Sequence, residues 1–216
     1  MKTYKTTIVD YGVGNLFSVY QAFSKATDSQ VVVSGDQDEI CNSDFIVLPG
    51  VGAFGKAIQQ LKKNKLLSLI NDLAKNGKPI FGICLGMQLF ASRSYEFGEF
   101  EGLDLIPGNV QKISSELEIK IPFIGWSEIE ITDHTDEEIN LIKDFDSKSM
   151  YTVHSFQFIA ENKSHEIGHY HYGGNKITSI VKKDNVLGVQ FHPEKSGYAG
   201  LSFINSIFNL MIDQNL

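Results

Sequence analysis

Short apolar runs alternate with helically periodic segments through the first half of the chain. The runs are of the kind that forms buried strands, and they lie at residues 6–9, 31–33, 45–48 and 79–81. Between them, apolar residues recur at helical spacing over residues 16–23 and 53–75. Repeated strand–helix units predict a parallel sheet that is covered by helices on both faces.

The second half of the chain is dominated by strand-like runs. These lie at residues 119–121, 149–159, 176–181 and 186–191, with Gly, Asn and Asp between them. The acidic stretch 133–138 is expected to be an exposed loop or a helix start, and helical spacing returns at 201–211. We therefore expect one α/β domain over residues 1–216, with a mixed, mostly parallel central sheet flanked by helices and an antiparallel extension in the second half.

Composition narrows the class of protein. The 216 residues are 42% hydrophobic and 21% charged, which suits a single sizeable core. A net charge of -7 without a long basic run argues against a nucleic-acid partner. We expect no membrane segment, because no apolar stretch reaches the roughly 20 residues that span a bilayer and the N-terminus has no signal-peptide core. Two cysteines, Cys41 and Cys84, form no disulfide framework and fit a reducing cytoplasm.

A Gly-Ile-Cys-Leu-Gly segment at residues 82–86 carries the first candidate for chemistry. It follows the apolar run at 79–81 and precedes an apolar-periodic segment at 87–90. A strand that feeds a helix through such a tight turn holds the central side chain out of the sheet, and we expect the glycines to permit the bend. Cys84 is therefore a candidate nucleophile, since a helix N-terminus and a nearby imidazolium both favour its thiolate.

His192 and Glu194 complete a candidate triad. They lie two residues apart after the run at 186–191, and residues i and i+2 of a strand share one face. His192 would accept the thiol proton and return it to the leaving group, while Glu194 would orient the imidazole. The oxyanion formed during attack needs backbone donors, for which the Leu85 amide and the loop at 49–52 are candidates.

Plainer interpretations compete with these assignments. A cysteine after a strand is usually a buried apolar residue, and Cys84 stands out only because the glycines and the His-x-Glu segment accompany it. Cys41 has no such setting and is interpreted as structural. His165, His169 and His171 lie in a polar, strand-like region without a matching cysteine or carboxylate set, so we expect no metal site.

Seven segments of the chain resemble the class I glutamine amidotransferases, and within them the glutaminase subunits of imidazole glycerol phosphate synthase. They run nearly end to end in the family's order, at residues 10–16, 48–54, 82–88, 102–108, 125–126, 153–155 and 190–196. The resemblance implies a flavodoxin-like sheet and the hydrolysis of L-glutamine to glutamate and ammonia. It also implies a γ-glutamyl thioester on Cys84, with no cofactor.

Further roles are implied by the resemblance alone. It assigns the triad to Cys84, His192 and Glu194, and the oxyanion hole to Val51 and Leu85. The glutamine would be held by Gly52, Gln88, Glu96 and Ser155. The ammonia would pass to a (β/α)8-barrel cyclase, which makes imidazole glycerol phosphate in histidine biosynthesis. This cyclase would be bound as a heterodimer through a surface that includes Asn15 and Trp126.

The chain departs from the family's pattern within residues 122–127, where Phe123 and Ser127 replace a usual histidine and asparagine. We expect this segment to face the partner, so the changes leave two partners open: the cyclase, or another synthase such as one that amidates a surface sugar. Two other classes of protein compete. Gln88 and Trp126 disfavour a stand-alone cysteine hydrolase, and the intact triad disfavours a non-catalytic binding module.

Overall fold

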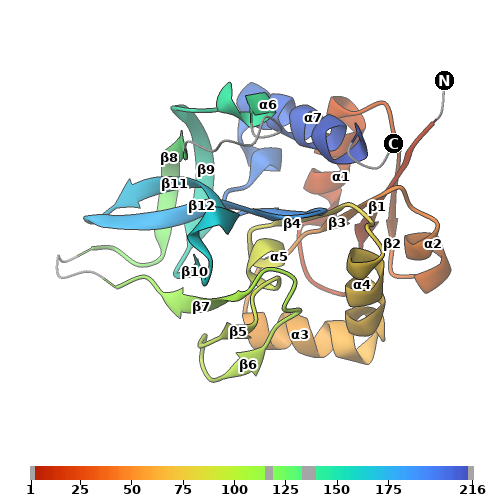
Figure 1. Ribbon diagram of the computed structural model, residues 1–216, viewed down its shortest axis with the longest axis horizontal. Helices are drawn as coiled ribbons and strands as arrows, with labels where there is room; N and C mark the ends of the chain where they lie inside the picture. The colour runs from red at the N-terminus through yellow and green to blue at the C-terminus, as the bar shows by residue number, and fades with distance from the viewer. Residues whose placement is uncertain (1–2, 115–118, 133–139, 214–216) are drawn as a thin grey trace.

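A nine-stranded sheet runs through the protein in the order β2-β1-β3-β4-β13-β12-β11-β8-β9 (Figure 1). The computed structural model describes residues 3–114, 119–132 and 140–213. The strands of the parallel half are β1 (Lys5–Val9), β2 (Gln30–Ser34), β3 (Phe45–Leu48), β4 (Ile80–Ile83) and β13 (Val186–Val189). Those of the antiparallel half are β12 (Asn175–Lys183), β11 (Glu166–Tyr172), β8 (Phe123–Ile131) and β9 (Lys148–His154). The predicted mixed sheet with an antiparallel extension is confirmed.

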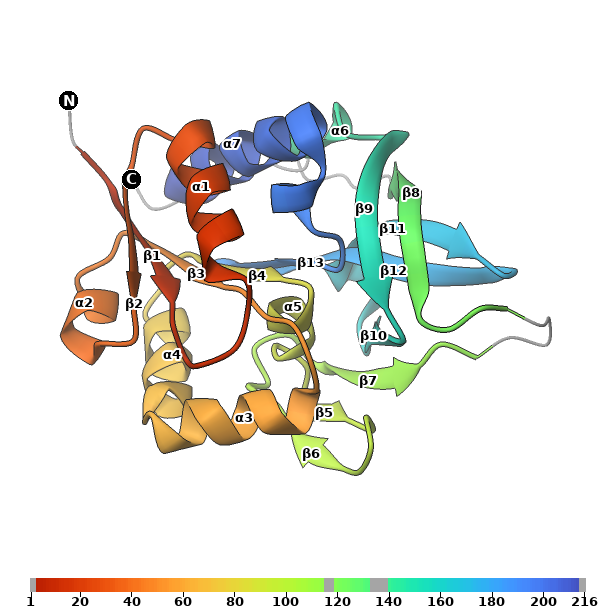
Figure 2. The ribbon, with the colours of Figure 1, turned by 180° about the vertical axis from the view of Figure 1, so that it is seen from behind.

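Helices cover the parallel half of the sheet on both faces (Figures 1 and 2). One face carries α1 (Leu16–Ala26) and α7 (Gly197–Asp213), and the other carries α3 (Phe54–Lys63), α4 (Leu66–Lys75) and α5 (Leu85–Gln88). The short helix α6 (Asn140–Lys143) packs against α7 on the side of β9. Helix α2 (Gln37–Cys41) lies near the β2 edge. No helix in the described ranges is long and apolar enough to cross a membrane.

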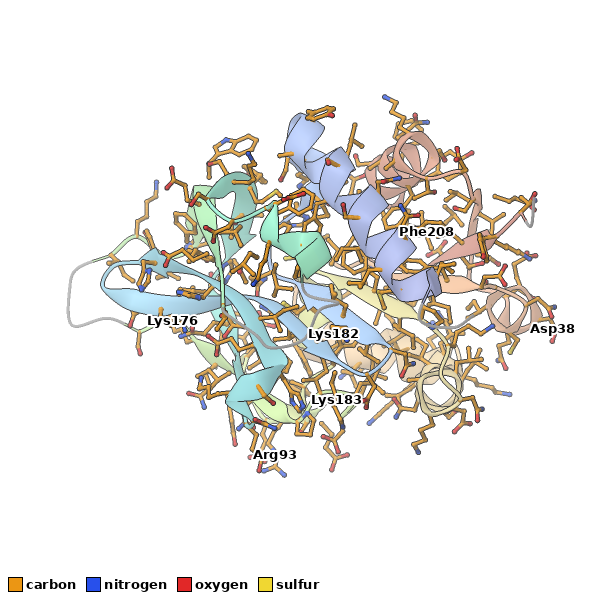
Figure 3. All side chains as sticks on the ribbon, turned by 45° about the horizontal axis from the view of Figure 1, so that its top comes forward. Asp38, Arg93, Lys176, Lys182, Lys183 and Phe208 are labelled. Carbon is orange, nitrogen blue, oxygen red and sulfur yellow. The ribbon has the colours of Figure 1, made fainter. Side chains whose placement is uncertain are left out.

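The central strands send alternate side chains into two cores. Val47 belongs to the core beneath α1 and α7, whereas its neighbour Ile46 belongs to the core beneath α3 and α4. In the first core, Phe208 of α7 packs against Phe45 of β3 with ring centroids 5.4 Å apart. Phe208 is labelled in Figure 3, on the helix that lies across the sheet. Burial on both faces explains why these strands are uninterrupted apolar runs.

The structure corrects several expected elements. Residues 31–33 form a strand that is only half-buried, because β2 is the edge of the sheet. The helical segment 53–75 breaks into α3 and α4 at Lys65, whose φ of 56° is left-handed. No strand forms at residues 119–121. The acidic stretch 133–138 lies outside the described residues.

A second sheet of four strands was not expected from the sequence. Its order is β10-β7-β5-β6, formed by β10 (Phe156–Ala160), β7 (Gly108–Lys112), β5 (Arg93–Ser94) and β6 (Phe100–Glu101). The expected strand 149–159 is divided at Ser155, so that β9 stays in the large sheet while β10 enters the small one. Two short 3-10 helices, η2 (Lys163–His165) and η3 (Pro193–Lys195), complete the elements used below.

Candidate active site

Cys84 occupies a strained turn between β4 and α5. Its φ of 53° and ψ of -107° are values that residues with a side chain rarely adopt. The turn is held from behind, because the Cys84 backbone N–H donates to the Val189 carbonyl at 2.7 Å. This is the geometry of a nucleophile elbow, in which a sharp strand-to-helix turn presents the reactive side chain.

The glycines flanking Cys84 do not supply the bend, so the expectation about them is wrong. Neither Gly82 nor Gly86 has a positive φ. A Cβ on Gly86 would lie 1.7 Å from the Leu48 carbonyl oxygen, and one on Gly82 would lie 2.6 Å from the Phe90 ring. The glycines are therefore needed for close packing of α5 against the ends of the neighbouring strands, while Cys84 itself takes the strained conformation.

His192 and Glu194 form a buried pair. The His192 Nδ1 lies 2.7 Å from the Glu194 Oε1, and both side chains are about 2% exposed. Because a carboxylate only accepts, Nδ1 carries a proton and donates to Glu194, which leaves Nε2 for proton transfer. The expected geometry is wrong in one respect: β13 ends at Val189, so the pair does not share a strand face. Instead, η3 turns Glu194 back under the imidazole.

The charge of His192 is set by its neighbours. Burial lowers the pKa of His192, but the Cys84 sulfur and the Glu194 carboxylate outweigh burial and raise the pKa to about 9. The Nε2 atom is buried and has no hydrogen-bond partner within the described ranges. The imidazole is therefore placed to exchange a proton with groups in the cavity that it shares with Cys84.

One cavity of about 240 Å³ contains nearly all the predicted site residues. It is smaller than the roughly 300–1,000 Å³ of pockets that take drug-sized ligands, and so it suits a small metabolite. Its walls are formed by Val51, Gly52, Cys84, Leu85, Gln88, Glu96, Val153, His154, Ser155, Phe156 and His192. Glu194 contacts His192 without lining the cavity, and Asn15 and Trp126 lie elsewhere.

Two glutamines join the nucleophile to the cavity wall. The Gln88 Nε2 donates to the Phe156 carbonyl and to the Gln190 Oε1, both at 2.9 Å. The Gln190 Nε2 in turn lies 3.6 Å from the Cys84 Sγ and donates to it. Gln190 was not among the predicted site residues. Gln190 begins the family-like segment 190–196, but nothing in the sequence pattern shows where a buried amide points.

Two further residues hold the loops around the cavity. The Tyr11 hydroxyl donates to the Pro49 carbonyl at 2.5 Å, which anchors the loop at residues 49–52. The Glu96 Oε2 accepts from the Phe54 backbone N–H at 2.6 Å. Burial raises the pKa of Glu96, and the hydrogen bond from Phe54 opposes that rise. Tyr11 was not predicted as a site residue, because its role depends on a loop 38 positions away.

Comparison with known proteins agrees with this geometry. Residues 7–209 match the family described as glutamine amidotransferase class-I. The chain is a class I glutamine amidotransferase. The amidotransferase is 42% identical over 211 residues to imidazole glycerol phosphate synthase subunit HisH 1 of Legionella pneumophila (strain Paris), covering 94% of this chain and 98% of the relative. It is 41% identical over 202 residues to the HisH subunit of Aquifex aeolicus, covering 94% and 95%. The enzyme thus belongs with the HisH subunits within its family.

Solved structures of other proteins share its fold. The structure of PurLQS from Thermotoga maritima superposes with a TM-score of 0.75 at 17% identity, covering all of both chains. The glutaminase domain of CTPS from Trypanosoma brucei, with bound acivicin, gives a TM-score of 0.67 at 15% identity, covering 98% of this chain and 94% of that one. At these identities the likeness concerns the fold, and it confirms the expected architecture.

The departures from the family's pattern point away from the surface of the amidotransferase. Phe123 packs against Tyr172 with ring centroids 4.2 Å apart, and Ser127 is 6% exposed. Ile124 and Trp126, on the opposite face of β8, are each 57% exposed. The expectation that Phe123 and Ser127 alter a partner-facing surface is therefore wrong, because strand alternation turns both inward.

Proposed function

We propose that this amidotransferase hydrolyses L-glutamine through a thioester on Cys84 and passes the ammonia to the cyclase subunit of imidazole glycerol phosphate synthase. It would do so as one domain over residues 1–216. The observation that carries the chemistry is the single small cavity shared by Cys84 and His192, with Glu194 paired to the imidazole behind it. The partner is proposed from the names of the HisH relatives.

In the first step, the Cys84 thiolate attacks the side-chain carbonyl carbon of glutamine. The proton of the thiol resides on the His192 Nε2, and Glu194 stabilises the imidazolium. The negative charge on the carbonyl oxygen is received by backbone N–H groups of Leu85 and Val51, which line the cavity with Cys84. When the tetrahedral intermediate collapses, His192 gives its proton to the leaving nitrogen, and ammonia departs.

In the second step, water cleaves the thioester. His192, now neutral at Nε2, takes a proton from the water as the oxygen attacks the thioester carbon. The C–S bond then breaks, glutamate forms, and Cys84 returns to the thiolate beside the imidazolium. One histidine therefore acts as acid and then as base, which requires the fixed orientation that its 2.7 Å bond to Glu194 supplies.

The substrate is proposed to contact Gly52, Gln88, Glu96 and Ser155, all of which line the cavity. The Gln88 Nε2 already donates twice within the protein, so its contact with glutamine would come from Oε1. Gly52 has a φ of 100°, and a Cβ there would meet nothing within 4 Å, so its backbone is open to a ligand.

The partner would bind where apolar side chains are exposed beside the cavity. Trp126 lies edge-on to Tyr151 at 5.9 Å, and Tyr151 lies 6.4 Å from the His192 ring. Phe17 of α1 is 72% exposed. It lies two residues after Asn15, whose side chain caps the N-terminus of that helix. Exposed aromatic residues are typical of interface cores. Since Phe123 and Ser127 face inward, neither favours a different synthase over the cyclase.

The experiment is glutamate release by the purified chain, with and without its host's cyclase subunit and the cyclase ligand. We expect strong stimulation by the loaded cyclase, weaker stimulation of Trp126→Ala, and unchanged stimulation of Val33→Ala. Val33 is the matched control, because it is an exposed apolar residue on the far edge strand β2. If the cyclase neither binds nor stimulates while a glutamine-analogue electrophile still alkylates Cys84, the proposed partner is wrong and the glutaminase assignment stands.

A further inference from the structure

Two histidines of β11 and a glutamate of β8 form a cluster away from the catalytic cavity. The Glu130 Oε2 lies 3.3 Å from the His169 Nε2, and its Oε1 lies 2.9 Å from the His171 Nδ1. One ligand atom from each of the three residues lies within 4.8 Å of the others. A carboxylate partner for these histidines could not be predicted from the sequence. Glu130 is 41 positions from His171, and strand pairing brings the two together.

The strand geometry brings the three side chains to one face. Glu130 is paired directly with His169 across the two strands, and His171 follows His169 by two residues. Ligands on paired strands have fixed backbones, so little conformational freedom is lost when they converge on one ion. Two imidazoles and one carboxylate form a set that zinc and related divalent transition metals accept, with water in the remaining position.

We propose that Glu130, His169 and His171 bind a divalent transition-metal ion such as Zn²⁺ and thereby clamp β8 to β11. Glu130 and His171 are about half-exposed, so an ion can reach the cluster from solvent and keep a water ligand. His169 is 13% exposed and would supply the inner ligand.

The clamp would strengthen the shortest junction of the large sheet. In the described strands, β8 and β11 share only two registered residue pairs, whereas β8 and β9 share seven and β11 and β12 share six. The β8–β9 pair carries Trp126 and ends at Val153 and His154, which line the catalytic cavity. A metal at the junction would therefore hold this wall of the enzyme to the rest of the sheet.

The charges around the cluster are compatible with a cation. Hydrogen bonding to His171 lowers the pKa of Glu130, which keeps the carboxylate ionised. Burial lowers the pKa of His169, and so does the nearby Lys176, which leaves the imidazole neutral as a metal requires. Lys176, labelled in Figure 3 on β12, would repel the ion, but it is ion-paired with the Glu166 Oε1 at 3.5 Å.

The surroundings also set an upper limit on affinity. The His169 Nδ1 is buried and lacks a hydrogen-bond acceptor among the residues described. Zinc-binding histidines usually donate this second N–H to an outer partner, whose removal weakens binding by roughly 10–100-fold. We therefore expect a site weaker than a structural zinc centre, with full occupancy only when free zinc is supplied.

The test is calorimetric titration of Zn²⁺ into tag-free, chelator-treated protein. All variants are made in a Cys84→Ala background, which removes the thiol of the catalytic cavity as a competing ligand. We expect one bound Zn²⁺ per chain, with binding weakened roughly tenfold or more by His171→Ala and by Glu130→Gln. Both positions are half-exposed, so these changes leave the core intact.

His165→Ala is the matched control, because His165 lies in η2 and belongs to no such cluster in the described part of the chain. It should bind Zn²⁺ like its parent. Zn²⁺ should also raise the melting temperature of the parent and of His165→Ala, but not that of His171→Ala, while Mg²⁺ should raise none. The proposal is overturned if the parent binds no Zn²⁺, or if His171→Ala and Glu130→Gln bind it as tightly as the parent.

Discussion

His154 makes the stability of this enzyme depend on pH in a way that can be isolated by one substitution. The imidazole is buried between the Phe156 carbonyl, 2.7 Å from Nδ1, and the Tyr170 hydroxyl at Nε2. Because a carbonyl only accepts, Nδ1 carries the proton and Nε2 accepts from Tyr170. Burial lowers the pKa of His154, the hydrogen bond to Phe156 opposes that drop, and the charge on His192 adds to it, so that the pKa falls from 6.5 to about 4.

The sign of the effect follows from proton uptake. Above pH 6.5 both the folded and the unfolded chain hold His154 neutral, so the residue adds no pH dependence. Below pH 6.5 His154 binds a proton in the unfolded chain but stays neutral in the folded chain. The free energy of unfolding therefore falls with pH until the pH reaches about 4. The drop in pKa corresponds to roughly 3 kcal/mol in total. Roughly 1 kcal/mol of this should be lost by pH 5.5.

The assay is urea denaturation of the wild type and of His154→Asn at pH 7.5 and pH 5.5. Asparagine keeps a donor near the position of Nδ1 but does not titrate, so its constant cost cancels when the two pH values are compared. The wild type should lose roughly 1 kcal/mol more than the variant between these pH values. His165→Asn serves as the comparison: burial also lowers the pKa of His165, which is only partly buried, so its removal should change the pH dependence less than His154→Asn does. An equal pH dependence in the wild type and His154→Asn would refute the reasoning.

Three further predictions concern the machinery around Cys84. Gly86→Ala should lower the free energy of unfolding by about 1–3 kcal/mol, since its Cβ would lie 1.7 Å from a carbonyl oxygen. In the same denaturation assay the control Gly125→Ala should lower it far less, because the nearest atom to its Cβ would lie 3.4 Å away. Glu194→Gln should lower the pKa of His192 in an NMR titration and reduce kcat less than His192→Ala does; an unchanged pKa would contradict the assigned pair. Tyr11→Phe should remove about 1 kcal/mol of stability and reduce kcat for glutamine by loosening the loop at 49–52; wild-type turnover would count against the anchor.

The parallel half of the fold could be predicted because burial on both faces leaves a plain signature. The strands 45–48 and 80–83 are continuous apolar runs, and the structure places both at the centre of the sheet. The same pattern wrongly predicted a buried strand at 31–33, since an apolar run does not show whether its strand lies at the edge of the sheet. The small sheet was missed because its strands β5 and β6 contain two residues each, too few to show any period.

The candidate site was predicted as a set of residues but not as a geometry. Cys84, His192 and Glu194 were found from their spacing, yet the strain falls on Cys84, and Glu194 acts from a 3-10 helix. Gln190 and Glu130 were missed for a common reason. Each takes its role from a partner far away in the sequence, so long-range packing decides it and local pattern cannot.

The most direct test of the central claim is mass spectrometry of the enzyme quenched in acid during glutamine turnover. The account predicts a γ-glutamyl group on the peptide that contains Cys84, and no such group on Cys84→Ala. Glutamate release should disappear in that variant while its thermal melting stays close to that of the wild type. An adduct on another residue, or continued turnover by Cys84→Ala, would contradict the assignment of Cys84 as the nucleophile.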